Sequence, residues 1–100
     1  MSARTILKYV LRPDDGVAAL NLPTGSVVRH VGHDPNNLLA MWIEQDVIGK
    51  GDPKSVTMTE RRFQIVGTGA TLPALVLGPT FVGTAATPGQ QMVWHIFEVA

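Results

Sequence analysis

Proline, glycine and asparagine interrupt this chain so often that no regular element in it can be long. Between these turn signals lie short segments rich in β-branched, aromatic and other apolar residues. Many short strands separated by turns are typical of an antiparallel barrel or sandwich, so the sequence predicts an all-β fold with little or no helix. The seven predicted strands are Thr5–Leu11, Val17–Leu22, Ser26–Val31, Leu38–Asp46, Glu60–Val66, Thr80–Thr84 and Gln90–Val99.

Helix competes with strand over Leu38–Asp46, because leucine, alanine, methionine and glutamate all favour helices. The segment is short, however, and lies between turn signals. Its apolar residues Leu39, Met41 and Ile43 also alternate with Ala40 and Trp42, as they do in a strand. We therefore predict a strand.

The stretch Pro13-Asp14-Asp15-Gly16 has the composition of a tight turn and predicts a hairpin between the first two strands. Its adjacent carboxylates could bind a cation or activate water. Adjacent aspartates before a glycine are also what a turn prefers, so the turn is sufficient to explain them.

Composition predicts one globular domain spanning residues 1–100, with 45% hydrophobic and 16% charged residues. Eight basic and eight acidic residues cancel, which argues against a nucleic-acid polymer or an anionic membrane as partner. The absence of cysteine excludes disulfides and thiolate chemistry and suits a reducing cytoplasm. The apolar runs are too short for a membrane span, and the charged start, with Arg4 and Lys8, is unlike a signal peptide.

The last predicted strand is apolar on both of its faces. Met92, Trp94 and Ile96 alternate with a second apolar set, which consists of Val93, His95, Phe97 and Val99. One face of such a strand packs in the core, and the other needs a further cover. The simplest cover is a second copy, so we expect a homo-oligomer, most simply a symmetric dimer.

Gly67-Thr68-Gly69 ends another predicted strand and is the main candidate for a ligand site. Glycines allow positive φ angles and close approach, so the backbone N–H groups here could hold an anion, with Thr68 adding a hydroxyl. Arg61 or Arg62 could pair with a phosphate; the two point to opposite faces of the strand, so one of them at most faces the site. The alternative is a glycine turn that only ends the strand. Neither a P-loop nor a GxGxxG pattern is present.

Aromatic and histidine side chains complete the candidate set. Trp94 and Trp42 could stack on a base or ring, although a buried tryptophan in a one-domain protein is more often a core residue. His95 lies on the apolar face assigned to an interface or cleft, where it is either a hydrogen-bonded structural residue or a ligand contact. His30, His33 and Asp34 resemble a metal cluster by composition, but residues three apart on a strand face opposite ways, so we expect no metal site.

Catalytic machinery is scarce in this sequence. There is no cysteine and no Gly-x-Ser-x-Gly elbow, and the few serines lie at positions 2, 26 and 55. For an enzyme, the candidate general base is His95 or a carboxylate in a turn. We expect a protein that is not an enzyme and carries no cofactor.

Several motifs along the chain together resemble a family of small domains of unknown function that tailed bacteriophages and prophages encode. The resemblance spans nearly the whole chain and implies a phage accessory protein made in the cytoplasm of the infected bacterium; it implies no active site. The chain departs from the family's pattern at Ala70, where a histidine or polar residue often follows the Gly-Thr-Gly. The motifs are Lys8-Tyr9, Leu22-Pro23-x-Gly25, Trp42, Arg61 or Arg62 with Phe63, Gly67-Thr68-Gly69, Phe81-Val82-Gly83-Thr84 and Val93-Trp94-His95-Ile96-Phe97-Glu98.

Three hypotheses of function follow. The first is a non-enzymatic protein that sequesters a small anionic ligand, such as a nucleotide immune signal of the host, at a homo-oligomer interface; its site residues would be Arg61, Arg62, Gly67, Thr68, Gly69, Trp94 and His95. The second is a structural or protein-interaction module, either a virion component or an inhibitor of a host protein. The third is a hydrolase of a phosphodiester or nucleotide.

Overall fold

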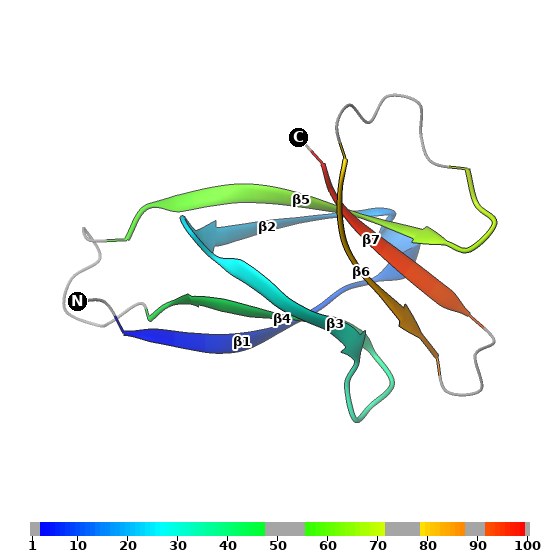
Figure 1. Ribbon diagram of the computed structural model, residues 1–100, viewed down its shortest axis with the longest axis horizontal. Coiled ribbons are helices and arrows are strands. Elements are labelled where there is room, and N and C mark those ends of the chain that lie inside the picture. Colours follow the sequence, from blue (N-terminus) through cyan, green and yellow to red (C-terminus); the bar gives the residue numbers. More distant parts are fainter. Residues whose placement is uncertain (1–2, 48–55, 72–78, 88–91, 100) are drawn as a thin grey trace.

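The computed structural model describes residues 3–47, 56–71, 79–87 and 92–99. Within these ranges the chain forms seven strands and one short 3-10 turn, η1, at Pro13–Asp15 (Figure 1). The all-β prediction is confirmed. The strands are β1 (Arg4–Val10), β2 (Val17–Pro23), β3 (Val27–His33), β4 (Leu39–Asp46), β5 (Met58–Gly67), β6 (Thr80–Ala86) and β7 (Val93–Val99).

The strands form two antiparallel sheets. One sheet has the order β1-β4-β3 and the other β2-β5-β7-β6. The two sheets pack face to face, and the described strands do not close into a barrel, so of the two predicted architectures the sandwich is the one observed. We call the side of each sheet that faces the other sheet its inner face, and the opposite side its outer face.

The sequence prediction of Leu38–Asp46 as a strand is confirmed, because β4 is the central strand of the smaller sheet. The predicted hairpin at Pro13–Gly16 is wrong. β1 pairs with β4 and β2 pairs with β5, so the turn carries the chain from one sheet to the other. Leu11 explains this crossing: its side chain is buried in the core, and its N–H donates to the carbonyl of Leu39 at 2.8 Å.

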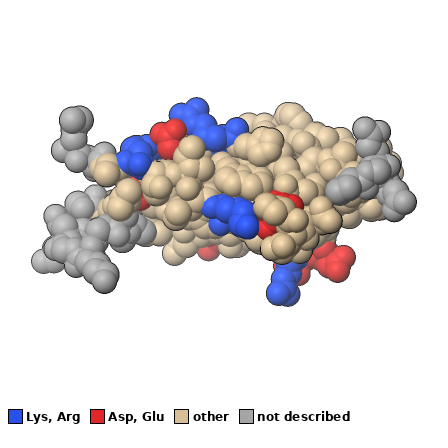
Figure 2. All heavy atoms as spheres, turned by 90° about the horizontal axis from the view of Figure 1, so that it is seen from below, with Lys and Arg blue, Asp and Glu red and all other residues tan. Residues whose placement is uncertain are grey.

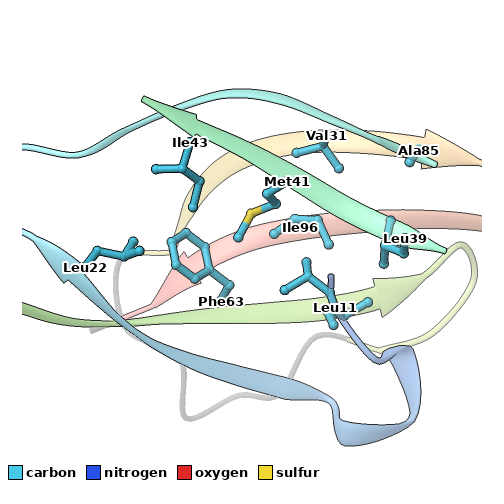
Figure 3. Packing of buried hydrophobic residues seen from close by; sticks show 10 residues of the cluster. Leu11, Leu22, Val31, Leu39, Met41, Ile43, Phe63, Ala85 and Ile96 are labelled. Carbon is cyan, nitrogen blue, oxygen red and sulfur yellow. The ribbon is translucent and has the colours of Figure 1, made fainter. Parts of the chain in front are cut away.

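The core lies between the two inner faces. Figure 3 shows Met41 of β4 and Phe63 of β5 pointing toward one another, with Ile96 of β7 beside them. All three side chains are fully buried. Burying each of them stabilises the fold by roughly 1.5 to 3 kcal/mol relative to leaving it in water. Leu11 and Leu39 lie together at one end of this core (Figure 3).

Gly83 lets β6 of one sheet approach β3 of the other closely. A Cβ placed on Gly83 would lie 2.8 Å from Cγ2 of Val31, which is too short for a real contact. A register shift between Phe81 and Gly83 marks a bulge at the same place. Glycine is therefore required here by packing between the sheets.

We predict that Gly83→Ala destabilises the protein by about 1 to 3 kcal/mol, because the new methyl group overpacks Val31. Val31→Ala removes the clashing methyl groups, so the double variant should be more stable than the sum of the two single effects predicts. Denaturant unfolding of the four proteins measures this coupling. Additive effects would contradict the close approach.

Arg61 joins β5, β7 and the start of β3 through its side chain. Its Nε and Nη2 donate to the two carboxylate oxygens of Glu98, each at 2.7 Å, and its Nη1 donates to the carbonyl of Ser26. The guanidinium also lies 5.6 Å from the ring centre of Phe63. This hydrogen bonding by Arg61 holds the pKa of Glu98 below its ordinary value of 4.5, although partial burial opposes the shift.

Because the pKa of Glu98 is lowered in the folded state, its stabilising effect is present above the unfolded pKa and is lost as pH falls through the folded value. We predict that Glu98→Gln lowers the free energy of unfolding by about 1 to 2 kcal/mol at neutral pH, a figure already reduced for solvent screening. The difference from the wild type should shrink as the pH is lowered from about 6 to about 3.

Glu60→Gln is the matched control, since Glu60 pairs with Arg62 at 3.0 Å on the same sheet but both side chains are more than half exposed. Its effect should stay below about 0.5 kcal/mol at every pH. Equal effects of the two substitutions in pH-dependent unfolding would contradict the structural role of Arg61.

Charged groups are few on the surface, and both signs are mixed. Figure 2 shows blue and red groups separated by broad uncharged areas on the side of the molecule that it displays. Among the described residues, no helix has the length and apolar character needed to cross a membrane.

Candidate functional site

Gly67-Thr68-Gly69 forms a β-turn at the end of β5. The N–H of Ala70 donates to the carbonyl of Gly67 at 3.0 Å, and Gly69 has a φ of 90°. A positive φ at the third position is the mark of a type II turn, for which glycine is the preferred residue. The turn is held to β7 by the N–H of Thr68, which donates to the carbonyl of Val93 at 3.0 Å.

The first glycine has a different task from the second. Gly67 pairs with Trp94 across β5 and β7, and a Cβ on Gly67 would lie 3.3 Å from Cζ3 of Trp94. The indole therefore packs directly over the backbone of Gly67. Gly67 makes room for a ring, while Gly69 supplies the turn angle.

The turn also borders a small hollow on the outer face of the larger sheet. The hollow has a volume of about 210 Å³. The structure thus brings together Gly67, Thr68, Gly69 and His95, four of the predicted site residues. The described residues that line it are Val66, Gly67, Thr68, Gly69, Ala70, His95 and Phe97.

His95 lies between two threonines in this region. Its Nε2 is 2.7 Å from Oγ1 of Thr68, and its Nδ1 is 2.9 Å from Oγ1 of Thr84 on β6. A hydroxyl both donates and accepts, so the two threonines can satisfy either tautomer of a neutral imidazole. In a catalytic triad, a hydroxyl nucleophile lies beside a histidine, and a carboxylate on the other side of the histidine orients its ring. Here a second threonine stands in the place of that carboxylate. The arrangement fixes His95 and gives no support to catalysis.

The predicted arginines do not lie at the hollow. Arg61 is on the inner face, where Glu98 and Ser26 occupy its donors. Arg62 is on the outer face and pairs with Glu60, six residues along β5 from Thr68, which is roughly 20 Å at the rise of a strand.

Part of the backbone of the turn is also engaged. The N–H groups of Thr68 and Ala70 donate to protein carbonyls, so these two donors are not offered to an anion. The binding of an anionic ligand by Gly67-Thr68-Gly69 stays a prediction. The described geometry supplies neither the arginine nor a full set of free donors for it.

Trp94, the remaining predicted site residue, points to the inner face and lines a second, larger cavity of about 620 Å³. This cavity lies where β1 ends, near η1, the β3–β4 loop and the end of β6 (Figure 1). Sequence reasoning missed it, because its lining comes from segments far apart in the chain. Trp94, His33 and the adjacent Asp14 and Asp15 are candidates from the sequence, but nothing in the sequence places them at one site.

The residues considered for a metal cluster separate in the structure. The Asp34 carboxylate caps its own loop, with Oδ1 accepting from the N–H groups of Asn36 and Leu38, and Oδ2 lies 2.8 Å from Nζ of Lys8. His30 packs against Trp42 at 5.3 Å between ring centres, and His33 borders the larger cavity. No group of three or more metal-ligating side chains is found within the described ranges.

The outer face of the larger sheet carries an apolar row next to the small hollow. Phe81 of β6 and Phe97 of β7 are register partners whose rings meet edge to face, with 5.6 Å between centres. Phe81 is 57% exposed and Val17 of β2 is 46% exposed. Val93 and Val99 extend the row along β7 and are half-buried.

The fold and the surface define a small all-β sandwich with a row of apolar side chains on the outer face of its larger sheet. A family model described as "Domain of unknown function (DUF7352)" matches residues 2–100, and the chain belongs to that family. Comparison with curated proteins and with solved structures gave no match.

The different tasks of the two glycines can be tested by substitution. We predict that Gly69→Ala costs about 1 to 2 kcal/mol of stability through its positive φ, while the emission of Trp94 stays unchanged. Gly67→Ala should instead shift the emission of Trp94, because the indole must move by a few tenths of an ångström.

Fluorescence in a Trp42→Phe background reports on Trp94 alone, since the chain has two tryptophans. Gly69→Asn is the control, because asparagine tolerates the left-handed region better than alanine does. Unchanged Trp94 emission in Gly67→Ala would refute the packing role of Gly67.

Proposed function

We propose that the protein is a non-enzymatic interaction module that self-associates through the outer face of β2-β5-β7-β6. The observation that carries the proposal is the apolar row on this face, in which Phe81 and Val17 are exposed and Phe97, Val93 and Val99 are half-buried. Apolar side chains gathered on one sheet face are typical of an interaction surface.

The two-residue period of β7 explains why this row exists. Ile96 points inward and is fully buried, whereas Val93, His95, Phe97 and Val99 point outward and remain half-buried. A central strand of an antiparallel sheet with apolar residues on both sides has one side covered by the core. Its other side is only partly covered within one copy of the chain.

A second copy is the occupant that fits this surface best. The charged pair on this face, Arg62 with Glu60, neutralises itself, and the chain has no net charge. Two such faces therefore meet without electrostatic repulsion. A twofold arrangement would place the Phe81 and Phe97 pair of one copy against the same apolar row of the other.

The resemblance to phage and prophage domains adds a setting to the proposal. In that setting the protein acts in the cytoplasm of an infected bacterium, as a virion component or as an inhibitor of a host protein. Sequestration of a small anionic ligand is the second candidate, and the hollow beside Thr68 and His95 on the proposed interface is the observation that favours it. We rank ligand sequestration below self-association because neither Arg61 nor Arg62 lies at the hollow.

We predict that the wild type is a dimer by analytical ultracentrifugation and that Phe81→Glu shifts it toward monomer by at least tenfold in Kd, since a buried unpaired charge is costly. Ile6→Glu is the matched control, because Ile6 is 54% exposed on the outer face of the other sheet. It should leave the dimer intact.

Circular dichroism establishes that both variants remain folded. A wild type that stays monomeric up to near-millimolar concentration would overturn the proposal. Dissociation by Ile6→Glu and not by Phe81→Glu would overturn it as well.

A further inference from the structure

The cavity of about 620 Å³ at the end of the sandwich is not part of the proposed self-association surface. We call it the end cavity. Its size falls within the range of roughly 300 to 1,000 Å³ typical of small-molecule sites. It opens between the two sheets, whereas the proposed interface is on the outer face of one of them, so the two surfaces are separate.

The inner part of the end cavity is apolar and firmly held. Leu11 and Leu39 are each 3% exposed, and their backbones are joined by a 2.8 Å hydrogen bond. Trp94 adds an indole whose position is set by its contact with Gly67. A fixed aromatic ring beside two buried leucines is suited to packing against a planar apolar group.

The exposed part of the end cavity is polar and carries an excess of negative charge. Among the described lining residues, Asp14 and Asp15 of η1 lie on it together with Arg12 and His33, so with His33 neutral the formal charge there is one negative. In the described part of the chain, no salt bridge involves these four side chains, in contrast to Asp34, which pairs with Lys8. A cation entering the cavity would meet a carboxylate at the edge and the Trp94 indole further in.

We infer that the end cavity binds a small organic molecule that combines a planar aromatic ring with a cationic amine. The ring packs against the half-buried Trp94, with Leu11 and Leu39 buried beneath it, and the amine pairs with Asp14 or Asp15. An anionic ring compound is disfavoured by the same two carboxylates. This site goes beyond the proposed function, since it needs neither the outer sheet face nor a second copy.

Three probes of matched shape test the charge preference: phenethylamine, phenethyl alcohol and 3-phenylpropionate. They are titrated into the ¹⁵N-labelled full chain and followed by NMR. The indole N–H of Trp94 should shift, with the amine binding about fivefold more tightly than the alcohol and the carboxylate binding most weakly. The indole N–H of Trp42, on the outer face of the other sheet, is the internal control and should not move.

The double variant Asp14→Asn/Asp15→Asn should bring the amine and the alcohol to within twofold of each other. Glu60→Gln, which removes an exposed carboxylate on another face, should keep the fivefold preference. Trp94→Phe retains a ring and should weaken the binding of all three probes by the same factor. If this variant fails to fold, the double aspartate variant still tests the preference for the amine.

Equal affinities of the three probes for the wild type would overturn the inference, as would equal shifts at Trp94 and Trp42. Binding should persist in Phe81→Glu. The outcome at the end cavity is therefore independent of whether the protein self-associates.

Discussion

The alternation of side chains along β7 is the constraint on which the structure depends. Ile96 points inward and is fully buried beside Phe63, while Phe97 points outward and meets Phe81. Because the strand has a two-residue period, no shift of register can bury both rows in one sandwich. The core and the apolar outer face are therefore consequences of the same seven residues, Val93–Val99.

Adjacent residues of β7 also lie in two different candidate binding regions, because they point to opposite faces of the sheet. His95 lies in the small hollow with Thr68, and Trp94 lies in the end cavity on the opposite side of the sheet. Gly67 contacts both regions, since it borders the hollow and supports the Trp94 indole. The Gly-Thr-Gly is thus a turn and a packing site at once, and its described contacts are explained without a ligand.

Local pattern was sufficient to predict the strands, because alternation and turn residues act over a few positions. β4 is an example: the alternation of Leu39, Met41 and Ile43 outweighs its helix-forming composition. Pairing could not be predicted in the same way. The Pro13–Gly16 turn looks like a hairpin, yet the burial of Leu11 sends the next strand to the other sheet.

The candidate site at Gly67-Thr68-Gly69 was predictable only in part, because sequence patterns are local and strand pairing is not. Gly67, Thr68 and Gly69 are adjacent in the sequence, and His95 joins them because Val66 and His95 are register partners. The partner of Arg61 is Glu98, 37 positions away, and no local signal indicates that this carboxylate occupies the guanidinium. The end cavity gathers residues from β1, η1, the β3–β4 region and β7, together with Thr87 just after β6, so only the fold reveals it.

The central claim is that a second copy covers the outward row of β7. Isotope-filtered NOE spectroscopy on a mixture of labelled and unlabelled chains tests it most directly, because only contacts between copies give a signal. The account predicts intermolecular NOEs between the rings of Phe81 and Phe97 and the methyl groups of Val93 and Val99. Intermolecular NOEs confined to Ile6 and Val10 on the other sheet, or none at near-millimolar concentration, would contradict it.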